Sequence, residues 1–208
     1  MTGSAEAKKC DDLLFWVIMS SLFLIVLILK HVVFYASNGA NICDELLYKQ
    51  NAANFIAGLK IVTHPVLYPP LYSLLLTPAF LFANWYDVMI IINGIISTLL
   101  FVPVWFMARS FMGTRFSAFA VLLSLMLPFQ IIYPSCIMSE NLFMPLFASA
   151  VLLALRGSGA GKLQAALFGL TLAAAHLTRH LMLPAVFILS FFWIAMPYLI
   201  SDKDSGFP

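Results

Sequence analysis

This chain of 208 residues consists largely of long apolar runs separated by short polar turns, a pattern that leaves few ways to fold. Hydrophobic residues make up 62% of the chain and charged residues 10%, whereas about half of a soluble domain is apolar and about a quarter is charged. Helices that cross a bilayer satisfy their own backbone hydrogen bonds and expose apolar side chains to lipid. The sequence therefore predicts an all-α polytopic transmembrane protein.

Six of the apolar runs are expected to cross the membrane completely. They are Leu13–Ala36, Asp87–Ala108, Phe116–Ser135, Ile137–Leu155, Leu163–Leu177 and Leu181–Ile200. A seventh run, Val66–Trp85, contains three prolines, and proline shortens a helix because it lacks a backbone N–H.

The basic residues decide how the seventh run is placed. If Val66–Trp85 does not cross, most Lys and Arg side chains fall on one side of the membrane, as cytoplasmic loops require. These residues are Lys8, Lys9, Arg109, Arg115, Arg156, Lys162 and Lys203. We therefore predict six full spans with the N-terminus inside, and Val66–Phe82 as a helix in or dipping into the outer leaflet.

This topology divides the chain into three parts. The tails 1–12 and 201–208 are expected to be cytoplasmic. The module 13–200 is expected in the plasma membrane, with an extracytoplasmic first loop over residues 37–86.

Three polar clusters fall on the extracytoplasmic side in this topology. Ionisable residues near the membrane are costly and suggest function, so the joint placement of the clusters is informative. The last cluster has the spacing i, i+3, i+4 and shares one helix face if the helix extends that far. The clusters are Asp44-Glu45, Ser139-Glu140, and His176 with Arg179 and His180.

Each cluster also has a purely structural interpretation. Asp44 is a suitable N-cap for a helix Glu45–Gly58. Ser139-Glu140 can open the helix that follows. Arg179 can extend to lipid headgroups, and His176 can simply pack between helices.

Charge and cysteine content exclude several kinds of partner. The net charge is only +2, which suggests no nucleic-acid partner. The three cysteines have no metal-binding spacing and form no disulfide framework. Cys43 and Cys136 fall on the same predicted side, so a disulfide between them and two buried thiols are both open.

Several short motifs along the chain form one combination. They are Asp44-Glu45, Tyr48, Ala52-Ala53 and Tyr68–Pro78 in the first loop, then the turn Arg109–Arg115, Leu127-Pro128 with Tyr133-Pro134-Ser135 and Ser139-Glu140, and Leu177-Thr178-Arg179 with Pro184. This combination resembles the GT-C fold glycosyltransferases, membrane enzymes that use polyprenyl-phosphate sugars and include protein O-mannosyltransferase-like and aminoarabinose transferase-like members. The resemblance spans roughly residues 13–190 and implies the conserved N-terminal module of a cell-envelope enzyme.

The resemblance implies transfer of a sugar from a polyprenyl-phosphate donor to a hydroxyl of a lipid, glycan or protein acceptor. Asp44 would be the general base, and the reaction would invert the anomeric centre. Arg179 would contact the donor phosphate, and Glu45 and Glu140 would position sugar hydroxyls or a divalent ion. The remaining expected substrate-binding residues are Tyr48, Lys60, Tyr68, Tyr72, His176 and His180.

Two alternatives remain open at the level of sequence. The chain can be a non-catalytic lipid-binding subunit or one half of a split glycosyltransferase. It can also be a small transporter, although a transporter would place its charges near the midplane rather than at span ends. No cofactor is certain, and a divalent metal remains possible.

Overall fold

The computed structural model describes residues 15–22, 24–26, 28–29, 32, 43–58, 68–132, 136–156, 161–179 and 183–200. Within these ranges every regular element is a helix, so the all-α prediction is confirmed. The predicted tails, 1–12 and 201–208, lie outside the described residues, as do Lys60 and His180.

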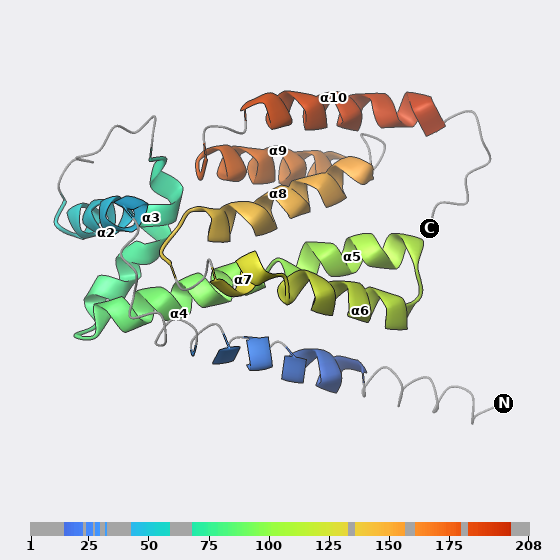
Figure 1. Cartoon of the computed structure of the whole chain (residues 1–208). Helices are drawn as coiled ribbons and strands as arrows, with labels where there is room; N and C mark the ends of the chain where they lie inside the picture. The colour runs from blue at the N-terminus through green and yellow to red at the C-terminus, as the bar shows by residue number, and fades with distance from the viewer. Residues whose placement is uncertain are drawn as a thin grey trace.

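The longest helical segment joins α4 (Trp85–Thr98) to α5 (Phe101–Phe111) along one line (Figure 1). Its 27 residues measure about 40 Å at the usual rise, against about 30 Å for a hydrocarbon core. Among the described residues, this is the one helix long and apolar enough to cross a membrane, and the predicted span Asp87–Ala108 lies inside it. The number of spans therefore stays a prediction.

A proline explains why this segment is divided at Leu99 and Leu100. Pro103 has no N–H to donate to the carbonyl four residues earlier. The carbonyl of Leu99 instead accepts from the N–H of Val102 at 3.1 Å. The chain keeps its direction and the helix continues past the irregular turn.

The run Phe116–Ser135 is not the single helix that the sequence suggested. The structure has α6 (Thr114–Leu125) followed by the short α7 (Pro128–Ile132), with a turn at Met126 and Leu127. Pro128 disfavours helical geometry in the residue before it and cannot donate within α6. The helix consequently ends and restarts.

Three further helices form successive layers, with α8 packed on α4 and α5, and α9 and α10 packed on α8 (Figure 1). They are α8 (Glu140–Leu155), α9 (Lys162–His176) and α10 (Leu183–Ile200). Small residues of α8, Ala150 and Ala154, are buried against Phe168 of α9, which stacks on Trp193 of α10 with 5.3 Å between ring centroids. Small side chains let helices approach closely, as in membrane bundles.

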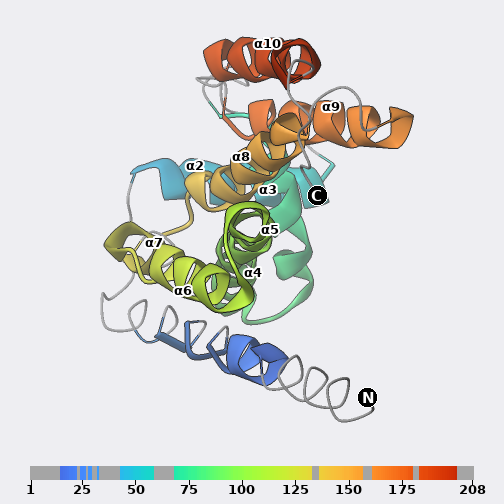
Figure 2. The ribbon, with the colours of Figure 1, turned by 90° about the vertical axis from the view of Figure 1, so that its right-hand side faces the viewer.

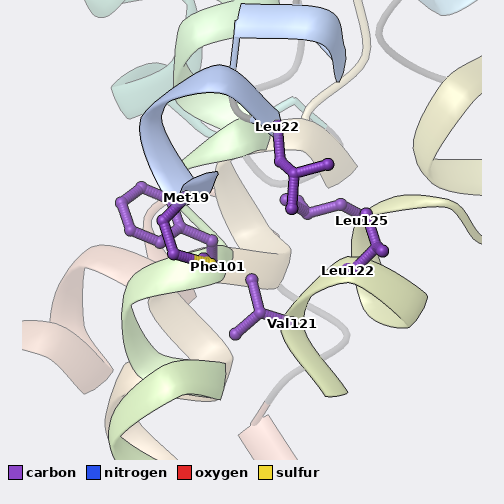
Figure 3. Close-up of a pocket in the computed structure, with 6 residues that line it drawn as sticks. All are labelled: Met19, Leu22, Phe101, Val121, Leu122 and Leu125. Carbon is purple, nitrogen blue, oxygen red and sulfur yellow. The ribbon is translucent and has the colours of Figure 1, made fainter. Parts of the chain in front are cut away.

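The helix Phe15–Val26 packs against α5 and α6 through apolar contacts. Phe15 stacks on Trp105 with 4.5 Å between ring centroids. A small apolar pocket separates this helix from its neighbours (Figure 3). The pocket is lined by Met19, Leu22, Phe101, Val121, Leu122 and Leu125.

Two short elements lie across one end of the bundle (Figures 1 and 2). They are α2 (Cys43–Ile56) and α3 (Pro70–Leu76), and α3 continues as the 3-10 helix η1 (Thr77–Leu81). The predicted helix Val66–Phe82 is therefore present from Pro70, which starts α3 because proline suits the first turn. We call this region the α2 end; the starts of α6 and α9 lie at the opposite end (Figure 1).

Candidate functional site

Asp44 lies in the first turn of α2 and is partly buried. The hydroxyl of Tyr68, two residues before the start of α3, donates a hydrogen bond of 3.1 Å to the Oδ1 atom of Asp44. The expected capping role for Asp44 is wrong, because α2 begins at Cys43, two residues before the predicted start at Glu45. Its charge still suits the positive end of the helix.

Glu45, the next residue, has a different environment. Its carboxylate is 1% exposed and binds Lys49 at 2.8 Å. Its Oε1 also accepts from the Tyr86 hydroxyl at 3.0 Å, and its Oε2 from the backbone N–H of Ile137 at 3.3 Å. Glu45 thus joins α2 to α4 and to the segment before α8, and these contacts occupy both of its oxygens.

Tyr48 connects α2, which carries Asp44 and Glu45, with Ser139 at the start of α8. Its hydroxyl donates a hydrogen bond of 2.9 Å to Ser139 Oγ, and its ring is buried. The ring meets Tyr68 and Tyr72 edge to face, with centroid separations of 5.7 and 5.0 Å. These contacts place one turn of α2 directly against the start of α8.

Burial raises the pKa of Tyr48 to about 12, and the carboxylates of Glu140 and Asp44 act in the same direction. The hydrogen bond to Ser139 and the charge of Arg179 oppose this shift only in part. The hydroxyl therefore stays protonated and can act as a donor throughout the physiological pH range.

This pKa predicts how Tyr48 titrates. In protein labelled with ¹³C at tyrosine Cζ, the signal lost in Tyr48→Phe is expected to remain that of a neutral phenol at pH 11. A free tyrosine is mostly ionised there. Since the folded pKa lies above the unfolded value of about 10, the stability that Tyr48 contributes is present below pH 10 and is lost as pH rises toward 12. Ionisation near pH 10 in the folded protein would contradict this environment.

Arg179 forms an ion pair with Glu140, through Nη1 and Oε1. Two backbone hydrogen bonds position the segment that carries Arg179. The N–H of Arg179 donates to the carbonyl of Ala175 at 3.0 Å, and the N–H of Leu71 donates to the carbonyl of Leu177 at 3.3 Å. The second contact fixes α3 beside the end of α9. The side chain of Arg179 is 36% exposed and that of Glu140 23%.

These contacts form one connected group at the α2 end, which we call the rim cluster. Its hydrogen bonds and ion pair run from Tyr48 through Ser139 and Glu140 to Arg179; Tyr68 adds Asp44 through its ring contact with Tyr48. Ser139 Oγ lies 3.5 Å from Glu140 Oε2. The structure thus brings together carboxylates, hydroxyls and a guanidinium from α2, from the segment before α3, from the start of α8 and from the segment after α9.

Two other expected site residues, Tyr72 and His176, border the rim cluster. Tyr72 is fully buried, and its hydroxyl donates a hydrogen bond of 2.7 Å to Asn93 Oδ1. Tyr72 is therefore a core residue whose hydroxyl is bonded inside the protein. His176 lies in the last turn of α9, one turn before Arg179, and is partly buried. Lys60 and His180 lie outside the described residues.

Sequence reasoning missed a buried amide group below the cluster. Asn93 and Asn141 both donate to the carbonyl of Cys136, at 2.9 and 3.1 Å. An asparagine within an apolar run is a signal that could have identified Asn93. The thiol of Cys136 is buried and forms no disulfide, which favours the second of the two cysteine alternatives.

The described residues contain no group of three or more His, Cys, Asp or Glu side chains arranged to hold a metal ion. A divalent ion therefore remains an expectation that rests on the resemblance. No protein family, curated protein or solved structure was found to match this chain.

Proposed function

We propose that this chain is a polytopic membrane protein that transfers a sugar from a polyprenyl-phosphate donor to an acceptor hydroxyl at the α2 end. The observation that carries this proposal is the rim cluster, which connects Asp44 to Arg179 through Tyr68, Tyr48, Ser139 and Glu140. Inverting transfer needs a carboxylate on one side of the reacting sugar and a cation for the departing phosphate. The cluster contains both groups.

The outer surface of the bundle supports a membrane environment. Large apolar side chains on several helices are more than half exposed, as is expected of helices that face lipid. Examples are Phe116, Phe119, Leu170, Phe187 and Phe191. The ends of α5 and α8 lie opposite the α2 end (Figure 1). Arg109 in the last turn of α5, Arg115 in the first turn of α6 and Arg156 at the end of α8 therefore lie away from the rim cluster.

In the proposed reaction, Asp44 accepts the proton of the acceptor hydroxyl as its oxygen attacks the anomeric carbon. Tyr68 orients the carboxylate through Oδ1. The bond between the anomeric carbon and the phosphate oxygen breaks, and the lipid phosphate leaves without needing a proton. Arg179 stabilises the departing phosphate because a guanidinium can contact two phosphate oxygens at once.

The alternatives differ in what they require of the α2 end. A transporter needs ionisable groups near the middle of the membrane. In the described residues, both ion pairs, Lys49–Glu45 and Arg179–Glu140, lie at the α2 end instead. A non-catalytic lipid-binding subunit would use the same cation for binding but would not need a basic carboxylate.

A transfer assay separates the enzyme from the lipid-binding subunit. We expect the purified protein in proteoliposomes to transfer labelled sugar to a hydroxyl acceptor from at least one member of a panel of polyprenyl-phosphate sugars. Retention of the intact donor, bound but unreacted across the panel, would favour the subunit. Donor movement between leaflets without cleavage would favour transport.

A further inference from the structure

The two rim residues expected to contact different parts of the donor contact each other instead. Arg179 was expected to bind phosphate, yet its Nη1 atom is paired with Glu140 Oε1. A carboxylate and a phosphate offer a guanidinium similar pairs of oxygens. We propose that Glu140 and a phosphate monoester or diester headgroup compete for Arg179, so that the headgroup displaces the carboxylate when it binds the guanidinium. The identity of the headgroup rests on the proposed function, whereas the exchange itself concerns only binding.

The exposure of the pair makes such an exchange feasible. Arg179 is 36% exposed and Glu140 is 23% exposed, so an anion can approach without dismantling the core. Ion pairs open to solvent contribute little to stability. A phosphate carries up to two charges and three acceptor oxygens, so it can replace a single carboxylate at this guanidinium.

Glu140 has other favourable contacts after displacement. It lies in the first turn of α8, where the helix N-terminus favours a negative charge. Its Oε2 atom is 3.5 Å from Ser139 Oγ, which in turn accepts from Tyr48. Loss of the contact with Arg179 therefore does not leave the charge of Glu140 uncompensated.

The second ion pair at the α2 end shows what a pair unsuited to exchange looks like. Glu45 and Lys49 are 1% and 14% exposed, and Glu45 also accepts from Tyr86 and from Ile137 N–H. Opening that pair would strand a buried charge, which is strongly unfavourable. This difference in burial indicates that Glu45 holds α2 against the bundle, whereas Glu140 can exchange with a phosphate at Arg179.

Competition between Glu140 and phosphate has a measurable consequence. Removing the carboxylate charge with Glu140→Gln is expected to tighten phosphate binding by about twofold to fivefold, the range that corresponds to an exposed ion pair. Arg179→Gln is expected to weaken binding about tenfold or more, because a charge-assisted contact is lost. Arg109→Gln is a matched control: Arg109 lies over Trp105 in the last turn of α5, and the variant is expected to bind phosphate as the wild type does.

Binding to the full chain in phosphate-free maltoside micelles tests this proposal by calorimetry. The probes are dodecyl phosphate, inorganic phosphate and uncharged dodecanol. We expect the affinity for dodecyl phosphate to fall in the order Glu140→Gln, wild type, Arg179→Gln. The affinity for dodecanol is expected to be the same in all variants. Equal affinity for inorganic phosphate would support the exchange with a free anion as the ligand. Glu140→Ala serves as the second variant if Glu140→Gln does not fold.

Two results would overturn the exchange. Unchanged or weaker phosphate binding in both Glu140 variants would mean that Glu140 does not compete. Wild-type affinity in Arg179→Gln would remove the guanidinium from binding altogether. If the expected order appears but no donor sugar is transferred, the proposed function fails and the exchange stands.

Discussion

Asp44→Asn is expected to reduce sugar transfer by about 10²- to 10⁴-fold, the usual contribution of a general base, while the protein remains inserted and folded. The amide has the shape of the carboxylate and can still accept the 3.1 Å hydrogen bond from Tyr68. It cannot remove the acceptor proton. Initial rates with the active donor from the panel, measured in proteoliposomes, check this expectation.

Asp87→Asn makes a matched control for that measurement. Asp87 lies in the first turn of α4, so the change in chemistry and in helix position is the same. It is expected to retain transfer, since Asp87 is not part of the rim cluster. A wild-type rate in Asp44→Asn would remove Asp44 from the base role, and equal losses in both variants would indicate a general effect of charge.

Glu45→Gln is expected to lower the free energy of unfolding by about 3 kcal/mol, as is typical when one partner of a buried ion pair is removed. The substitution leaves the ammonium of Lys49, which is 14% exposed, beside a neutral group. It also places an amide against the donors Tyr86 and Ile137 N–H, where the carboxylate accepted from both. Unfolding titrations in mixed micelles, followed by tryptophan fluorescence, measure the difference.

Two comparisons make the stability measurement specific. Glu140→Gln breaks an exposed pair and is expected to cost less than about 1 kcal/mol. The double variant Glu45→Gln with Lys49→Met is expected to recover part of the loss, because it removes both charges together. Equal stability of Glu45→Gln and Glu140→Gln would show that Glu45 does not fasten α2 to the bundle.

Local sequence signals predicted the helices best where a single segment decided the outcome. The run Asp87–Ala108 is found within the helix Trp85–Phe111, because its apolar length needs no partner to be recognised. Gly58, expected to end α2, has a φ of +65°, a conformation that glycine adopts without strain. The run Phe116–Ser135 was less well predicted, since apolar length was given more weight than Pro128.

The adjacent pair Asp44-Glu45 illustrates what the sequence cannot assign. Neighbouring residues on a helix point about 100° apart, so at most one of the two carboxylates can face the bundle at this position. Which one does so depends on Tyr86 and Ile137, which are 41 and 92 residues away from Glu45. The sequence predicted Asp44 as the general base and Glu45 as a residue that positions sugar hydroxyls or a divalent ion, whereas the structure encloses Glu45 and leaves Asp44 beside Tyr68.

By itself, the amino-acid sequence determined that this protein is helical and largely apolar, and that its charged residues collect near the ends of the helices. Those properties follow from local composition and periodicity, which act over one or two helical turns. Only the tertiary structure decided that Glu140 pairs with Arg179 and that Tyr48 lies beside both of them. Such contacts depend on how α2, α8 and α9 meet in space, and helices of similar composition can pack in many ways until particular side chains select one.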